Sequence, residues 1–340
     1  MSNSEELGSS HDYNPFTTGT MNKTYGEEAY QATKIFTISC YCISFIVGII
    51  GNLLVIQISG FKMKNVGAVW FLNLAIADFI FCLSLPFRVI EWLAVSDFEK
   101  DRHYINDLPV YLSILNFIMM TMNSAVSVTF LTAISVDRCV SIMWPLWAKV
   151  HRTRRLVRIV SVFLWLVPMI AVFFINVFTF RYKSPFLAVL PLQYISDSYG
   201  INKYLDRSIS MTISKIIFMF GIPLIIILIC YGLIVFKLHY NKFKRRKAFQ
   251  RTFRIIIAVV VCFFICWFPF STWPVLAWLM GISETLPDFI ISHVCLCLIS
   301  VSSCINPILY VLLGQARGAN YKKSIKARLE NAMSESPEER

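Results

Sequence analysis

The chain has 340 residues, of which 56% are hydrophobic and only 15% are charged, and its formal net charge is +12. A water-soluble protein carries about 25% charged residues and must hydrate most of its surface, so this composition excludes one. The high apolar content also excludes an intrinsically disordered chain. The protein therefore belongs in a membrane.

Seven long stretches carry almost no charge. They are residues 35–61, 65–87, 108–136, 159–180, 208–236, 255–283 and 289–316, and the exceptions inside them are Asp78, Lys215 and the titratable His293. Each stretch reaches the length of about 20 residues that a helix needs to cross about 30 Å of hydrocarbon. A membrane β-barrel would show shorter, alternating segments instead. The sequence therefore predicts an all-α membrane protein, a seven-transmembrane helix bundle.

The remaining segments divide the chain into four parts. We expect an extracellular N-terminal tail over residues 1–34, the seven-helix bundle over 35–313, and a cytoplasmic tail over 330–340. Between the bundle and that tail, residues 314–329 place Tyr321, Ile325 and Leu329 on one helical face. This pattern predicts a short amphipathic eighth helix that lies on the membrane surface.

The distribution of charge predicts the orientation. Most of the 32 lysines and arginines fall on one side of a seven-crossing bundle, and most of the 20 acidic residues fall on the other. The positive-inside rule places the basic side in the cytoplasm, so the N-terminus is expected outside. The net positive charge then reflects topology and attraction to anionic lipids, not nucleic-acid binding. Asn22-Lys23-Thr24 is a glycosylation acceptor on the expected outer side.

All ten cysteines lie within the predicted helices or at their edges. Disulfides form on the oxidising outer side of a membrane, and no cysteine is expected in an outer loop. We therefore interpret the cysteines as small packing residues.

One acidic residue, Asp78, falls in the middle of the second predicted helix. Ionisable groups in hydrocarbon are costly and usually functional, so Asp78 is either a cation or proton site or a neutralised structural acid. Five uncharged polar residues lie at a comparable depth on other predicted helices and would complete an oxygen-rich site: Asn52, Asn123, Ser127, Ser302 and Asn306.

Three short motifs stand at characteristic places in the predicted helices. Asp137-Arg138-Cys139 lies at the cytoplasmic end of the third helix. Cys266-Trp267-Phe268-Pro269 and Asn306-Pro307-Ile308-Leu309-Tyr310 place a proline inside the sixth and seventh helices. A proline removes a backbone hydrogen bond and bends its helix, so both helices are expected to be kinked.

With these motifs, residues 35–328 resemble a rhodopsin-like (class A) G-protein-coupled receptor. Further residues that carry the resemblance lie in the first, second, fourth and fifth predicted helices: Gly51-Asn52, Leu74 to Asp78, Trp165, Pro223 and Tyr231. Residues 137–142, 145–148 and 151–153 are similar to the second inner loop of the leukocyte chemoattractant receptors, the formyl-peptide, chemerin, anaphylatoxin and prostaglandin D2 types.

The resemblance implies two sites inside the bundle. A sodium pocket would be formed by Asp78, Asn123, Ser127, Ser302 and Asn306. An activation switch that couples to the G protein would be formed by Asp137, Arg138, Tyr231, Phe263, Pro269, Pro307 and Tyr310. In the resting state Asp137 would hold Arg138, and Trp267 above Pro269 would report ligand occupancy.

A ligand pocket is expected in the outer half of the bundle. Lys215 is the only charged residue of the fifth predicted helix, and it either covers apolar surface or anchors a ligand carboxylate. Arg88 would add a second cation. The other expected wall residues are Glu91, Asn116, Trp267, Trp273 and His293.

The chain departs from the class A pattern at one place. Most of these receptors join the outer end of the third helix to the second outer loop by a disulfide, but Ser113 occupies the helix position and residues 181–207 contain no cysteine. The outer lid that the family forms with this disulfide is therefore not implied for this chain.

The resemblance implies a plasma-membrane receptor for a chemoattractant-like peptide or lipid acid, not an enzyme. It would couple to a heterotrimeric G protein, of the Gi class by subfamily, through outward movement of the sixth helix. Arrestin and membrane lipids would be further partners, and no cofactor is expected besides an allosteric sodium ion. The alternative is a decoy receptor that scavenges ligand without coupling, although Asp137, Arg138 and Tyr231, which decoys often lose, argue against it.

Overall fold

A computed structural model of the chain describes residues 16–62, 66–98, 108–182, 213, 216–240, 247–282 and 285–313. The predicted eighth helix over 314–329, the tail over 330–340 and Lys215 lie outside these residues.

The described residues are helical over almost their whole length. The elements are α1 (Phe16–Gln57), η1 (Ile58–Lys62), α2 (Val66–Phe98), α3 (Leu108–Met143), α4 (Pro145–His151), α5 (Arg154–Tyr182), η3 (Ile217–Gly221), α8 (Ile222–Tyr240), α9 (Lys247–Leu279) and α10 (Leu286–Leu313). Seven helical spans, one in each predicted stretch, are long and apolar enough to cross a membrane. The predicted all-α bundle of seven transmembrane helices is therefore confirmed.

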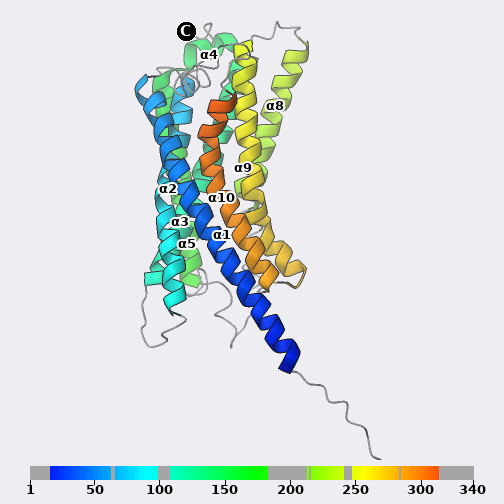
Figure 1. Ribbon diagram of the computed structural model, residues 1–340. Coiled ribbons are helices and arrows are strands. Elements are labelled where there is room, and N and C mark those ends of the chain that lie inside the picture. The colour runs from blue at the N-terminus through cyan, green and yellow to red at the C-terminus, as the bar shows by residue number, and fades with distance from the viewer. Residues whose placement is uncertain are drawn as a thin grey trace, which may run out of the picture.

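The first helix is much longer than a membrane crossing requires. It begins at Phe16, inside the stretch that the sequence predicts as a tail, and contains 42 residues. At 1.5 Å per residue its length is about 63 Å, roughly twice the thickness of the hydrocarbon layer. Figure 1 shows its N-terminal end extending past the other helices, at the end of the bundle opposite α4.

The third helix is the central element. It packs against α2, α5 and α8 and also contacts α4 and α9, whereas α1 packs against α2 and α10. The prolines Pro86, Pro168, Pro269, Pro274 and Pro307 all lie inside helices, as membrane helices tolerate. Large apolar side chains also cover the outside of the bundle, where lipid rather than water would contact them.

Two glycines allow α1 to approach its neighbours closely. A Cβ atom added to Gly51 would lie 2.9 Å from a ring carbon of Pro307, and one added to Gly48 would collide with the Cys82 sulfur. Beside them, the Asn52 side-chain amide donates to the Gly48 and Ser303 carbonyl oxygens, at 3.0 and 2.9 Å. Small residues and interhelical polar bonds are the usual means of joining helices in a membrane, and here they join α1 to α2 and α10.

We expect Gly48→Ala to lower the unfolding temperature of the purified protein in detergent, followed by tryptophan fluorescence. The added methyl group must displace the sulfur atoms of Cys82 and Cys304, and overpacking of this kind costs about 1–3 kcal/mol. Gly232→Ala on α8 is the matched control, because nothing lies within 4 Å of its added carbon. An unfolding temperature for Gly48→Ala at or above that of the control would contradict the close packing.

Candidate functional site

The centre of the bundle contains a polar junction around Asp78, whose side chain is buried in α2. The Asn306 amide of α10 donates to Asp78 Oδ2 at 2.7 Å, and the Asn123 amide of α3 donates to Asp78 Oδ1 at 3.3 Å. Ser303 of α10 also hydrogen-bonds this carboxyl group. We call these residues the Asp78 junction. It brings together three of the five residues predicted for a sodium pocket.

The other two predicted residues lie differently. The buried Ser127 hydroxyl, one turn along α3 from Asn123, has no hydrogen-bond partner among the described residues. Ser302, in contrast, hydrogen-bonds the Cys266 thiol of α9. A carboxylate and an unpartnered hydroxyl are oxygen ligands of the kind that hard cations prefer, so Asp78 and Ser127 fit a sodium ion.

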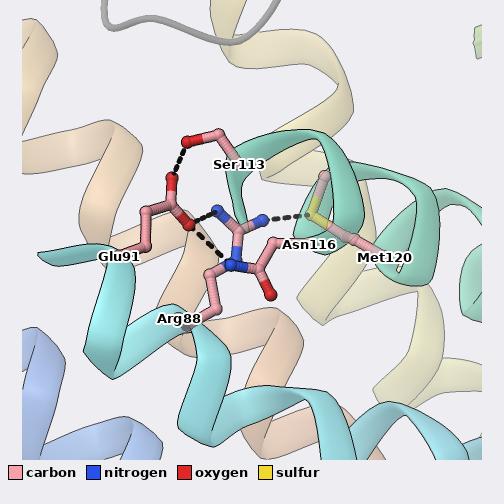
Figure 2. A network of polar contacts seen from close by, with 5 residues as sticks. All are labelled: Arg88, Glu91, Ser113, Asn116 and Met120. Carbon is pink, nitrogen blue, oxygen red and sulfur yellow. Dashed lines mark hydrogen bonds and ion pairs between the residues drawn. The ribbon is translucent and has the colours of Figure 1, made fainter. Parts of the chain in front are cut away.

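A second polar cluster lies near the end of the bundle where α2 finishes. The Glu91 carboxylate accepts hydrogen bonds from the Ser113 hydroxyl and, at 2.6 Å, from the Asn116 amide, both of α3. It also forms an ion pair with Arg88 at 3.6 Å. Figure 2 shows the Arg88 guanidinium between the Glu91 carboxylate and the sulfur of Met120. We call Arg88, Glu91, Ser113 and Asn116 the Glu91 cluster.

The Glu91 cluster changes how two predicted pocket residues act. Arg88, expected as a second ligand-binding cation, is already paired with Glu91, and both side chains are mostly buried, at 18% and 14% exposed. The carbonyl oxygen of the buried Asn116 has no hydrogen-bond partner among the described residues, so it is open to a donor. Ser113, at the position of the missing disulfide, instead bonds α3 to α2.

His293 and Trp273 also lie at the Glu91 end of the bundle, and they contact different residues. His293 packs edge-on against Trp92, with ring centroids 4.8 Å apart, and Tyr30 of α1 stacks on Phe289 at 5.1 Å. The Trp273 indole donates to Asp288 at 2.7 Å, which joins α9 to α10. The sequence analysis missed Tyr30, Trp92 and Asp288. The sequence offers only weak indications of these residues: Trp92 follows Glu91, and Tyr30 and Asp288 lie near the ends of predicted helices.

An aromatic stack occupies the core between the two ends. Trp267 and Phe263 of α9 lie nearly parallel, with ring centroids 5.8 Å apart, and Phe220 of η3 stacks on Phe263 at 6.3 Å. Trp267 is 2% exposed and stands two residues before the helix-bending Pro269. The stack therefore links Trp267, through Phe263, to Phe220 of the fifth span.

The opposite end carries Asp137 and Arg138. Asp137 accepts two hydrogen bonds of 2.8 Å from Arg152, which follows α4, so the structure gives it a partner different from the expected Arg138. Arg138 is 8% exposed and lies close enough to interact electrostatically with Tyr231 of α8. The sequence analysis missed Arg152, which lies beyond a short helix and offers no pattern that pairs it with Asp137.

Three predicted residues are not placed. Lys215 lies outside the described residues. Asn22 of α1 and Tyr310 of α10 belong to described helices, but their side chains do not belong to the described part. Pro307 contacts α1 at Gly51.

The comparison with known families decides the class. Residues 51–310 match the family model described as "7 transmembrane receptor (rhodopsin family)". The chain belongs to this receptor family. The family match confirms a multi-pass receptor of the plasma membrane, and not an enzyme.

The similar receptors indicate the type. The chain is 32% identical to the C3a anaphylatoxin chemotactic receptor of Danio rerio over 312 residues, which cover 90% of this chain and 80% of that receptor. It is 33% identical to human chemerin-like receptor 1, with coverages of 90% and 82%. It is also 33% identical to formyl peptide receptor-related sequence 1 of Mus musculus, with coverages of 92% and 89%. The predicted chemoattractant type of receptor is confirmed.

We expect Glu91→Ala to lower the receptor's unfolding temperature, because Arg88 then remains buried without its ion-pair partner. Removing one partner of a buried pair costs about 3 kcal/mol or more. The double variant Arg88→Ala/Glu91→Ala should regain part of this loss, since no charge is left unpaired. Glu28→Ala, at an exposed position of α1, is the control and should leave the unfolding temperature unchanged. A double variant no more stable than Glu91→Ala would contradict the coupling.

Proposed function

We propose that the chain is a receptor for an extracellular chemoattractant-like peptide or lipid acid and that it signals through the Gi class of G protein. The named relatives of chemotactic, chemerin-like and formyl-peptide type support this ligand class. The observation that carries the coupling function is the position of Arg138, buried beside Tyr231 at the Asp137 end of the bundle.

The Glu91 cluster lies at the extracellular end in this proposal, and Asp137 lies at the cytoplasmic end. The charge distribution supports this orientation: basic residues crowd the segments around α4 and between α8 and α9, whereas acidic residues crowd the segment from Glu91 to Asp107. The N-terminus is then outside, where Asn22 can be glycosylated, and the C-terminus is inside.

The ligand enters between the Glu91 cluster, Trp273 and His293. Arg88 is neutralised by Glu91, so Lys215 is the cation that this proposal assigns to the ligand. A ligand carboxylate pairs with Lys215, because a desolvated ammonium group needs an anionic partner. The open carbonyl oxygen of Asn116 accepts a hydrogen bond from a ligand amide.

The signal passes along the aromatic stack. A ligand that displaces Trp267 moves Phe263 and Phe220, and α9 bends at Pro269 so that its cytoplasmic end swings outward. Tyr231 and Tyr310 then hold Arg138 in position for the G protein. The ion pair between Asp137 and Arg152 fixes the segment after α4 beside this surface.

A sodium ion regulates this transition through the Asp78 junction. Asp78 and Ser127 would hold the ion, with Asn123 and Asn306 orienting the carboxylate. Sodium that binds only the resting arrangement favours that state by its differential affinity.

The proposed coupling can be tested by expressing the receptor in cells and measuring suppression of stimulated cyclic AMP. The inputs are formyl peptides, complement fragments, chemerin-like peptides and lipid acids. We expect one class to suppress cyclic AMP, pertussis toxin to abolish the response, and Arg138→Ala to abolish it at equal surface expression. Binding of one class with silence in this assay would favour the decoy receptor instead.

We expect Lys215→Gln to weaken an acidic agonist by about tenfold or more, since the loss of one charge-assisted bond costs about 1.5–3 kcal/mol. Lys237→Gln, near the end of α8 that the proposal places in the cytoplasm, is the control. The same agonist with its carboxylate amidated should show no further loss on Lys215→Gln. Unchanged potency of the acidic agonist would exclude Lys215 as its anchor.

A further inference from the structure

Six of the ten cysteines form pairs that join different helices, and none of the sites above uses their sulfur atoms as ligands. The pairs are Cys40 with Cys297 between α1 and α10, Cys82 with Cys304 between α2 and α10, and Cys139 with Cys230 between α3 and α8. All six are free thiols. The third pair lies at the Asp137 end of the bundle, where Cys139 directly follows Arg138.

The third pair belongs to a small apolar cluster that contains another sulfur atom. Cys139 and Cys230 are 5% and 7% exposed, and the buried Ile234 of α8 packs with them. Met143 packs against the same cluster from α3. Because residues four apart lie on the same side of a helix, Met143 and Cys139 both contribute to the face of α3 that meets α8. We call Cys139, Met143 and Cys230 the sulfur cluster.

Two thiols and a thioether are ligands for a soft metal ion. Sulfur ligands select Cu⁺, whereas Mg²⁺ and Ca²⁺ require oxygen ligands. Zn²⁺ is usually held by four ligands drawn from cysteine, histidine and carboxylate side chains. Within the part of the chain that the structure describes, no group of three or more such side chains is placed to hold a metal. The sulfur cluster therefore fits Cu⁺ better than Zn²⁺.

The charge of a Cu⁺ complex suits its surroundings. The metal replaces both thiol protons, so two thiolates, a neutral thioether and one Cu⁺ carry a single negative charge. A buried charge requires an opposite charge nearby. Tyr231 interacts electrostatically with both Arg138 and Cys230, which places the Arg138 guanidinium within range of the sulfur cluster. Arg138 supplies the positive charge that such a complex needs.

The position of Met143 gives the metal a path into the cluster. Met143 is the last residue of α3 and is partly exposed, whereas Cys139 and Cys230 lie further inside the bundle. An entering ion meets the thioether first and the two thiols next. In the orientation proposed above, this entrance faces the cytoplasm, where thiols stay reduced. The Cys82–Cys304 pair, in contrast, is buried at 0% and 5% exposed against Gly48 of α1.

We propose that Cys139, Met143 and Cys230 form a binding site for a Cu⁺ ion between α3 and α8. The bound ion joins the helix that carries Arg138 to the helix that carries Tyr231, so it restrains the relative movement of these two residues. Metal binding here requires neither the proposed ligand nor the G protein, and only the side from which the ion enters rests on the proposed orientation.

The experiment uses the purified full-length receptor in lipid nanodiscs without oxygen. Cu⁺ is supplied as its complex with a coloured chelator, whose absorbance reports transfer of the metal to the protein. We expect Cys139→Ala/Cys230→Ala to take up about one Cu⁺ fewer than the unchanged receptor. Uptake by the other thiol pairs is common to both proteins and cancels in this comparison. Cys42→Ala, at an exposed cysteine of α1, is the matched control and should leave uptake unchanged.

Met143→Leu tests the thioether without removing a thiol. Leucine nearly conserves the volume of methionine, so the fold should be retained. We expect the affinity for Cu⁺ to fall by about tenfold, which corresponds to about 1.4 kcal/mol. Met169→Leu, at an exposed methionine of α5, is the matched control and should leave the affinity unchanged.

Thermal unfolding protects the test against misfolding of the cysteine variant. A metal that binds only the folded state raises the unfolding temperature, so Cu⁺ should stabilise the unchanged receptor more than Cys139→Ala/Cys230→Ala, whatever the starting value of each. Equal Cu⁺ uptake by these two proteins, unchanged affinity in Met143→Leu, or equal stabilisation of the receptor by Zn²⁺ would each overturn the proposal. Because no agonist or G protein is added, these outcomes are independent of the proposed signalling function.

Discussion

The arrangement of this receptor depends on one constraint: a carboxyl group placed in the middle of a membrane must find its partners inside the protein. Asp78 finds them on two other helices, through Asn123 and Asn306, while Asn52 ties α1 to the same region of α10. In hydrocarbon there is no water to replace a lost hydrogen bond. These helices are therefore held in register by polar groups that can form hydrogen bonds only with one another. α2, α5 and α8 all pack against the central α3, and this packing positions the Glu91 end and the Asp137 end of the bundle.

The buried charged side chains are paired differently at the two ends of the bundle. At the Glu91 end, Arg88 and Glu91 neutralise one another beside the neutral donors Ser113 and Asn116. At the Asp137 end, Arg152 takes the carboxylate and leaves Arg138 beside Tyr231. In the proposed function, the first arrangement leaves Lys215 to bind the ligand carboxylate, and the second holds Arg138 for the G protein.

The sequence was sufficient for features that depend on hydropathy and depth. The seven spans and the meeting of Asp78 with Asn123 and Asn306 followed from where polar residues interrupt apolar stretches. It was insufficient where the rotation of a helix or the path of a connection decides the partner. Ser302 and Ser303 are adjacent, yet only Ser303 bonds Asp78. Likewise, the pairing of Asp137 with Arg152 depends on how the chain passes α4, which no periodicity encodes.

The long first helix gives the bundle a mechanical property. Its free end stands beyond the other helices, and Tyr30 holds it against Trp92 and Phe289 of α2 and α10. Because α1 is a continuous helix, it can pivot as a rigid body about the contact of Tyr30 with Trp92 and Phe289. A sideways load on the N-terminal end of α1 therefore exerts a torque on the aromatic residues next to Glu91 and Asp288, so force applied to this helix reaches α2 and α10 together.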